Sequence, residues 1–129
     1  MDIDNTLRAA GLSPTVGRVA VFSALRGGKC LSAAAVARRA RKIPPATVYR
    51  ALASLCDAGL LRRVPGEKNA LYMQMDSHTA PQLICAKCGK VENVDSPEIR
   101  RYHSALQKDR GGDGALLMVA DCTRKECDS

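Results

Sequence analysis

Two pairs of cysteines are the residues whose type and spacing point most directly to chemistry. Cys85 and Cys88 stand in a Cys-Ala-Lys-Cys-Gly sequence, and Cys122 and Cys127 form a second pair near the C-terminus. Two thiolates at this spacing, followed by a glycine, suit a tight turn around a metal ion, and two such pairs complete the tetrahedral four-thiolate shell of structural zinc. The sequence therefore predicts one structural zinc ion per subunit, bound by Cys85, Cys88, Cys122 and Cys127.

The alternative for these cysteines is that they are unligated or form a redox dithiol. A redox Cys-x-x-Cys pair normally opens a helix in a thioredoxin-like unit, which this sequence lacks. A four-thiolate shell leaves no position for a reactive water, and the sequence shows no Ser/His/Asp set and no glycine-rich phosphate loop. We therefore expect no enzyme activity and no small organic substrate. Cys56 is expected to be a small core residue.

The net positive charge of the chain comes from its first part. The 129 residues carry a net charge of +7, to which residues 1–75 contribute +8 and residues 76–129 contribute −1. This length allows one compact domain or two very small ones. Lys and Arg side chains that neutralise phosphates supply most non-specific affinity for nucleic acid. The first part is thus a candidate nucleic-acid surface, and a solvated basic face without a partner is the alternative.

The chain is expected to be cytoplasmic and to make no membrane contact. No apolar run approaches the roughly 20 residues that span a bilayer. Residues 1–8 are acidic and polar, unlike the start of a secretory signal. A reducing cytoplasm disfavours a disulfide framework for the six cysteines.

Apolar spacing and turn residues divide residues 1–75 into helices followed by strands. The expected elements are two helices before Gly27-Gly28, a third helix capped by Ser32 and ending near Lys42, a fourth opened by Pro44-Pro45, and strands at Leu60–Pro65 and Ala70–Met75. Two helices followed by a hairpin predict a winged helix-turn-helix domain.

The fourth helix would be the DNA-reading element of such a domain. Its apolar face bears Val48, Leu52 and Leu55. A helix fits the major groove, where exposed polar side chains reach base edges, while the hairpin wing follows the backbone. The exposed face is expected to bear Thr47, Arg50, Ala51 and Ser54, with Tyr49 to one side, and the wing would contact phosphates through Arg62, Arg63 and Lys68. The alternative is an amphipathic core helix with a solvated back.

Residues 76–129 are predicted to form a small α/β unit. Strands at Gln82–Ile84 and Val91–Val94 flank the first cysteine pair, and a helix at Pro97–Lys108 and a strand at Ala115–Ala120 follow. The predicted fold class is therefore α+β, with a winged-helix domain at residues 1–75 and a zinc-binding α/β domain at residues 76–129.

The chain resembles the ferric uptake regulator family of bacterial metal-responsive transcription factors from about Leu7 to Cys127. The matching segments are Ala10-Gly11-Leu12 with Thr15 and Arg18, Leu31-Ser32-Ala33, Ala46 to Leu52, Ala58-Gly59-Leu60, and Leu83 to Val91. Pro44-Pro45 and the spacing of His78-Thr79-Ala80 before the first cysteine look most like the zinc uptake regulator branch.

The resemblance implies a homodimer that binds an AT-rich palindromic operator in double-stranded DNA and dimerises through its second domain. By the same match, Tyr49 and Arg50 would contact DNA with Thr47 close by, and Arg18 would touch the backbone. The four paired cysteines would hold the structural zinc.

Family members also carry a regulatory metal site at the domain hinge, built from histidines and carboxylates. Most of these ligands are missing here, since the corresponding residues are Cys30, Arg62 or Met73, His78, Asn93, Arg100 and Ala115. A second, sensory metal ion would have to use His78, His103 and Cys30, helped by Asp76 or Glu92. Surface or hydrogen-bonding roles are the alternative for both histidines.

Two mechanisms follow for a dimeric regulator, expected to repress metal-homeostasis or stress genes. A rebuilt hinge site would make DNA binding respond to zinc. A lost site would leave DNA binding without a metal signal, or under another input such as oxidation of Cys30. The competing function is a zinc-stabilised, non-regulatory adaptor that recruits RNA or protein through its basic face.

Overall fold

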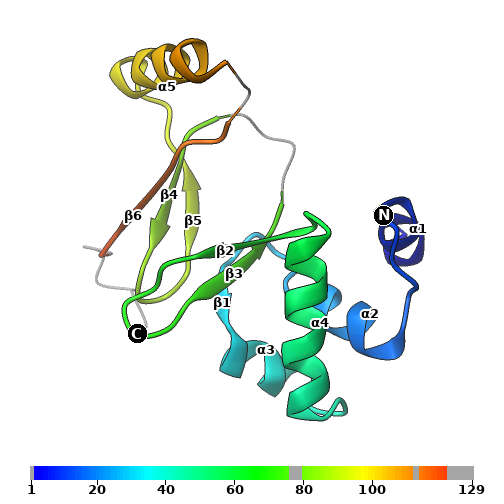
Figure 1. Ribbon diagram of the computed structural model, residues 1–129. Helices are drawn as coiled ribbons and strands as arrows, with labels where there is room; N and C mark the ends of the chain where they lie inside the picture. The colour runs from blue at the N-terminus through cyan, green and yellow to red at the C-terminus, as the bar shows by residue number, and fades with distance from the viewer. Residues whose placement is uncertain (1, 76–79, 112–113, 122–129) are drawn as a thin grey trace.

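The computed structural model describes residues 2–75, 80–111 and 114–121. Its first part contains α1 (Ile3–Ala9), α2 (Val16–Ala24), β1 (Leu31–Ser32), α3 (Ala33–Arg39), α4 (Pro45–Asp57), β2 (Leu61–Val64) and β3 (Leu71–Gln74) (Figure 1). Its second part contains β4 (Gln82–Cys85), β5 (Val91–Asn93), α5 (Pro97–Arg110) and β6 (Leu117–Ala120). No helix within these ranges is long and apolar enough to cross a membrane.

Side-chain caps start α1, α2, α3 and α5, whereas α4 starts at a proline without one. The Ser32 Oγ accepts a hydrogen bond from the Ala35 N–H at 3.2 Å, which confirms the predicted start of α3. Pro45 occupies the first turn of α4, as expected for a residue that lacks an N–H. Thr15 and Ser96 cap α2 and α5 in the same way as Ser32 caps α3.

The third helix is shorter than predicted, because it ends at Arg39 and not near Lys42. The Ala40 N–H still bonds to the Val36 carbonyl, but the backbone then leaves helical geometry at Ala40, with φ −101° and ψ 45°. The resulting turn lets the Ile43 N–H reach the Ala40 carbonyl at 2.9 Å and packs Ile43 against the core.

The predicted hairpin of β2 and β3 is confirmed, and a third strand joins it. The sheet order is β1-β3-β2, all antiparallel, with Leu31 opposite Tyr72 and Val64 opposite Leu71. The sequence did not predict β1, because two residues are too few to show an alternating pattern. The sheet extends the winged helix by one short strand beside α3.

α4 packs against α2, α3 and β2 through a wider apolar stripe than predicted. Ala51 is 5% exposed and belongs to the buried core, so its assignment to the exposed face was wrong. It falls three residues after Val48 and four before Leu55, both fully buried, which places it on the same face of a 3.6-residue helix.

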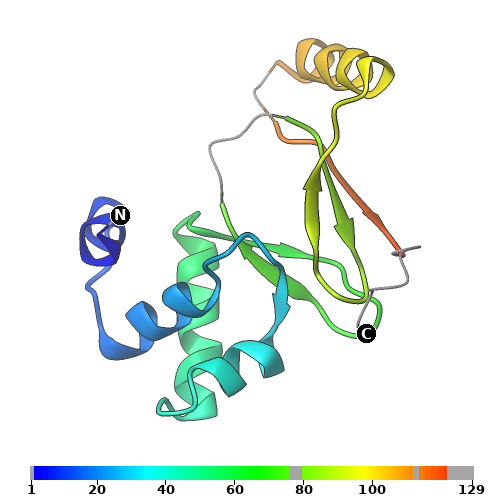
Figure 2. The same ribbon diagram turned by 180° about the vertical axis from the view of Figure 1, so that it is seen from behind.

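The second part is a β-β-α-β unit. The sheet order is β5-β4-β6, in which β4 pairs antiparallel with β5 and parallel with β6. Parallel pairing needs a crossover connection, and α5 lies within it, at the end of the sheet away from α3 and α4 (Figures 1 and 2).

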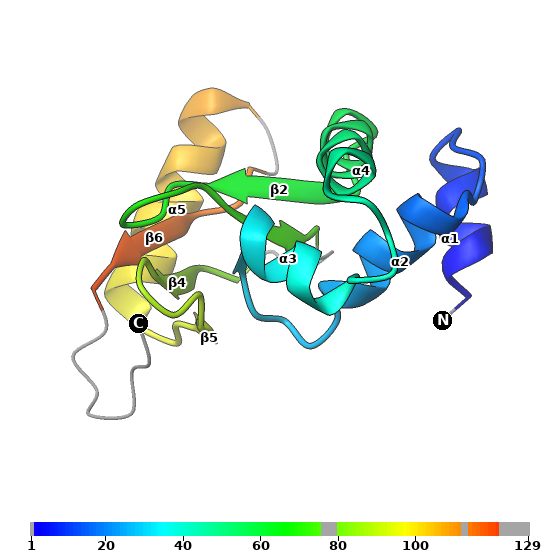
Figure 3. The same ribbon diagram turned by 90° about the horizontal axis from the view of Figure 1, so that it is seen from below.

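The two parts meet at the cysteine turn between β4 and β5. The Cys30 N–H bonds to the Gly89 carbonyl at 2.7 Å, and the Glu67 N–H bonds to the Ala86 carbonyl at 3.1 Å. A small apolar cluster, which includes Cys30, Met73 and Ile84, fills the space behind these bonds. From below, α4, α2 and α1 lie progressively further from the second sheet (Figure 3).

Candidate functional site

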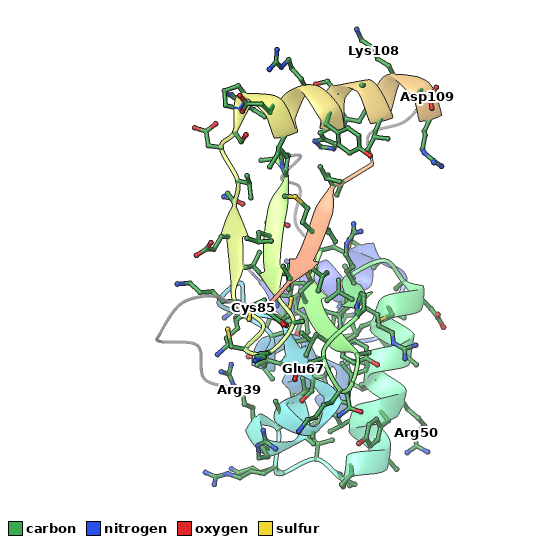
Figure 4. All side chains as sticks on the ribbon, turned by 90° about the vertical axis from the view of Figure 1, so that its left-hand side faces the viewer. Arg39, Arg50, Glu67, Cys85, Lys108 and Asp109 are labelled. Carbon is green, nitrogen blue, oxygen red and sulfur yellow. The ribbon has the colours of Figure 1, made fainter. Side chains whose placement is uncertain are left out.

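The N-terminal half of α4 presents an exposed polar surface. Tyr49 is 54% exposed, and Arg50 is also exposed on the outer side of the helix (Figure 4). The Arg50 Nη2 donates to the Thr47 Oγ1 at 3.4 Å, which links two of the predicted DNA-contacting residues on adjacent turns. These side chains lie on the solvent-facing side of a helix whose opposite face is buried, and their contact with bases stays a prediction.

Arg18 and Ser54 contact each other and brace this helix. The Arg18 Nε donates to the Ser54 Oγ at 3.1 Å, and its Nη1 donates to the Ser13 carbonyl at 3.0 Å. The sequence predicted a DNA contact for each residue separately and gave no signal that they would meet. The bond ties the start of α2 to the later turns of α4.

Gly17 brings α2 and α4 close together at the other end of the exposed surface. It is buried, and a Cβ at this position would lie 2.8 Å from the Thr47 Cγ2. A side chain at this position would force the Thr47 methyl group to shift, so Gly17 is what allows the two helices to approach this closely.

The wing carries its basic residues on different surfaces. Arg62 is half-buried, while Arg63 and Lys68 are exposed and line one shallow hollow beside the wing turn. Successive residues of a strand point to opposite faces, so Arg62 and Arg63 face away from each other. The structure therefore groups Lys68 with Arg63 and separates Arg62 from them.

The turn after β4 brings the backbone of Cys88 against the sulfur of Cys85. The Cys88 N–H points to the Cys85 Sγ at 3.4 Å, a contact that stabilises negative charge on sulfur. Gly89 has φ +78°, and its N–H bonds to the Cys85 carbonyl at 2.9 Å. A residue with a Cβ disfavours this conformation, so Gly89 is what lets the chain close around Cys85 and Cys88.

The second cysteine pair lies outside the described residues, but the strand that leads to it is described. Ala120 at the end of β6 is the register partner of Cys85, and the Ala86 N–H bonds to the Ala120 carbonyl at 2.9 Å. Cys122 follows two residues later in the sequence. The described chain therefore runs beside Cys85 as far as Ala120, and the four-cysteine site stays a prediction. Within the described ranges alone, no three His, Cys, Asp or Glu residues form a metal-binding group.

The candidate sensory residues are not brought together. His78 and Asp76 lie outside the described residues. His103 is 6% exposed on α5, and its Nε2 lies 2.7 Å from the Gly114 carbonyl oxygen. Because a carbonyl only accepts, we assign the proton to Nε2. Cys30 directly precedes β1 and bonds to Gly89 in the turn after β4. β1 lies at the opposite end of the second sheet from α5 (Figure 1). Glu92 lies on β5, 3.9 Å from the Lys90 Nζ.

Burial raises the thiol pKa of Cys30 and of Cys56, the two described cysteines outside the turn after β4. It raises the pKa of the Cys30 thiol from 9.0 to about 11. Burial, followed by the charge of Asp57, also raises the pKa of Cys56, which packs against the core as predicted. Both thiols are therefore protonated near neutral pH, and thiolates are the reactive form.

Together these features define a winged-helix protein whose second unit carries a cysteine turn. The model of the ferric uptake regulator family matches residues 11–114. A ferric uptake regulation protein of Cupriavidus metallidurans is 30% identical over 131 residues, which cover 94% of this chain and 92% of that protein.

Solved structures of regulators share the fold. The chain superimposes on the ferric uptake regulator of Vibrio cholerae with a TM-score of 0.73 and 24% identity, covering 94% of this chain and all of that one (100%). The Pseudomonas aeruginosa regulator, solved with manganese, gives a TM-score of 0.70 and 26% identity over 95% of this chain and 100% of that one.

The chain belongs to the ferric uptake regulator family. Members of this family are DNA-binding, metal-responsive transcription regulators and not enzymes.

Proposed function

We propose that this chain is a cytoplasmic, homodimeric, zinc-stabilised repressor that binds an AT-rich palindromic operator through α4. The observation that carries the proposal is the exposed surface of Thr47, Tyr49 and Arg50, held by the Arg18 to Ser54 bond and the close approach at Gly17. Arg63 and Lys68 would add phosphate contacts from the wing, since both are exposed beside the wing turn.

The proposed structural metal is one zinc ion per subunit, held by Cys85, Cys88, Cys122 and Cys127. The Cys88 N–H directed at the Cys85 Sγ and the register of Ala120 with Cys85 both support this ligand set. When bound, the ion would join the chain end to the β4–β5 turn without taking part in a reaction, because four thiolates leave no open position.

The proposed metal response is reduced or altered. His103 is engaged with the Gly114 carbonyl, and Cys30 lies apart from it at the domain junction. A second zinc ion in the manner of the zinc uptake regulator branch would therefore depend on His78. We propose that the operator is bound with little dependence on a second ion.

Selection from a pool of random DNA duplexes, followed by binding measurements, tests the DNA-binding role. We expect enrichment of a palindrome bound by a dimer. Arg50→Ala should weaken binding to that palindrome by about 5- to 150-fold if Arg50 reads a base, and relax the sequence preference there.

Lys108→Ala is the matched control, because it removes one positive charge at the far end of the molecule from Arg50 (Figure 4). The mass of the complex is measured alongside, so that a change in dimerisation is seen. Equal weakening by the two variants, or a single copy bound without symmetry, would favour the adaptor function.

Native mass spectrometry with a mild chelator tests the metal assignment. We expect one zinc per chain, retained under the chelator and lost in Cys85→Ser and Cys122→Ser. A second, chelator-labile ion that disappears in His78→Ala would replace the reduced response with an intact zinc sensor.

A further inference from the structure

A groove with a cavity volume of about 670 Å³ lies at the junction of the two domains. Four separate segments line it: the loop before β1, α3, the wing turn and the cysteine turn. They contribute five basic side chains, Lys29, Arg38, Arg39, Lys68 and Lys87, and one acidic side chain, Glu67. Figure 4 shows Arg39, Glu67 and Cys85 near one another on the same side of the molecule.

These basic side chains are not neutralised within the part of the chain that the structure describes. None of the five forms an ion pair there. The Arg39 Nη1 donates a hydrogen bond to the Ala24 carbonyl at 3.0 Å, which holds the guanidinium in place without cancelling its charge. Gathering like charges from distant parts of a chain opposes folding. An anion in the groove would remove this repulsion.

The walls of the groove are fixed before any ligand arrives. The bond from the Cys30 N–H to the Gly89 carbonyl joins the β1 side to the cysteine turn, and the bond from the Glu67 N–H to the Ala86 carbonyl joins the wing to it. A Cβ on Gly89 would overlap the Cys30 carbonyl, so the two walls are in direct contact. A site whose walls are already ordered binds a ligand more tightly than one that must become ordered on binding, because no free energy is spent on the ordering.

We propose that this groove binds a small oligophosphate anion, and that the bound anion bridges the DNA-binding domain and the metal-binding domain. The volume falls within the roughly 300–1,000 Å³ of small-molecule sites. Arg and Lys are the side chains suited to phosphate oxygens, Arg through a bidentate contact and Lys as a point charge.

The groove is distinct from the base-reading surface of α4. Thr47, Tyr49 and Arg50 do not line it, and Lys68 alone is shared with the predicted wing contacts. Because its walls come from both domains, an anion there would resist their separation. The proposal does not rest on the DNA-binding function, since anion binding is measured without DNA.

Isothermal titration calorimetry of the full-length, zinc-loaded protein with inorganic triphosphate at low salt tests the proposal. We expect saturable binding of one triphosphate per chain. The double variant Lys29→Ala/Arg38→Ala leaves the cysteine turn untouched and should weaken binding at least tenfold. The matched control is Arg8→Ala/Lys108→Ala, which removes the same charge from exposed positions on α1 and α5, outside the groove.

Three results would overturn the proposal. Absence of saturable binding would exclude a site. Equal weakening of triphosphate binding in the two double variants would show that triphosphate is attracted only by the net charge. A binding heat in the groove variant equal to that of the unmodified protein would show that triphosphate chelates the metal ion. If triphosphate does not bind but the groove variant lowers the salt dependence of DNA binding, the groove contacts the DNA backbone instead.

Discussion

Cys30 is 1% exposed and lies against the cysteine turn, so its surroundings decide its chemistry. Burial disfavours the charged thiolate and raises the pKa of the thiol to about 11. A cysteine that senses oxidants needs an accessible thiolate. The thiol of Cys30 is therefore poorly suited to the oxidant response that its position in the sequence suggested.

Alkylation of Cys30 by iodoacetamide should follow this raised pKa. In the folded protein we expect the rate to rise about tenfold per pH unit from neutral pH and to level off only near pH 11. In urea the rate should level off near the ordinary value of 9.0. Peptide mass spectrometry reads the rate at Cys30 separately from Cys56. A plateau below pH 9 in the folded protein would contradict the assignment.

The same shift predicts how stability depends on pH. Between pH 9 and 11 the unfolded thiol has lost its proton while the folded thiol retains it, so the folded state binds more protons. This contribution to the free energy of unfolding is present below pH 9 and falls as the pH rises toward 11. Cys30→Ala should flatten that part of a urea-unfolding profile.

His103 is a second residue whose contacts define its role. Replacing it with Phe removes the hydrogen bond to the Gly114 carbonyl, although the Gln107 Nε2 still reaches that oxygen at 3.3 Å. We expect His103→Phe to lower the free energy of unfolding by about 1 kcal/mol in urea and to leave the metal content unchanged. The exposed neighbour Tyr102, changed to Phe, is the control and should stay within about 0.5 kcal/mol. Loss of a metal ion in His103→Phe would make His103 a ligand.

At the scale of elements, α2 fixes where α4 stands. The close approach of Gly17 to Thr47 and the bond between Arg18 and Ser54 hold two successive regions of α4. The core residues Val21 and Leu52 belong to the same cluster behind them. In the proposed function, side chains on α4 would present a defined pattern to DNA only while this packing is kept.

Gly17→Ala tests this packing, because we expect it to lower the free energy of unfolding where a Gly-to-Ala change in a helix usually raises it. In an exposed helix the change would be stabilising by about 1 kcal/mol, because alanine favours helix. Here the new Cβ would meet the Thr47 Cγ2, and we expect a net loss of about 1–3 kcal/mol together with weaker operator binding. Thr47→Ser removes that methyl group, so Gly17→Ala/Thr47→Ser should be at least as stable as Thr47→Ser alone. Additive losses in this cycle, measured by urea unfolding, would locate the strain elsewhere.

At the scale of the whole molecule, the two domains pack against each other at the cysteine turn. Gly89 forms the turn through its φ of +78°, and its carbonyl accepts the hydrogen bond from Cys30 in the first domain. The wing reaches the same turn through Glu67. A metal ion that stiffens the turn would therefore also hold the wing and β1.

Gly89→Ala should separate the domains, and Gly59→Ala provides a control with nearly the same backbone strain. Gly59 has φ +79° with open space around it, whereas a Cβ on Gly89 would overlap the Cys30 carbonyl. Each variant loses about 1 kcal/mol or more from its positive φ. Only Gly89→Ala should also increase proteolysis between the domains and the radius measured by small-angle X-ray scattering. Equal behaviour of both variants would show that the contact with Cys30 is dispensable.

Features that depend on neighbours along the chain could be predicted from the amino-acid sequence. Ser32 and Pro45 start helices, and Gly89 closes a turn, because each acts on backbone groups within a few residues. The spacing of Cys85 and Cys88 and the period of Val48, Leu52 and Leu55 are equally local. These patterns were enough to predict the helices and the hairpin of the winged helix, the cysteine turn, and the exposure of Tyr49 and Arg50 on α4, but not the burial of Ala51.

Features that join residues distant in the sequence depend on how the whole chain packs. Leu31 becomes a strand because Tyr72 lies opposite it, and Ala51 is buried because α4 packs on three neighbours. Arg18 donates a hydrogen bond to Ser54, 36 positions away in the sequence. The basic groove forms where four segments of the chain meet. Such contacts are set by the packing of the whole chain, which positions side chains independently of their separation in sequence.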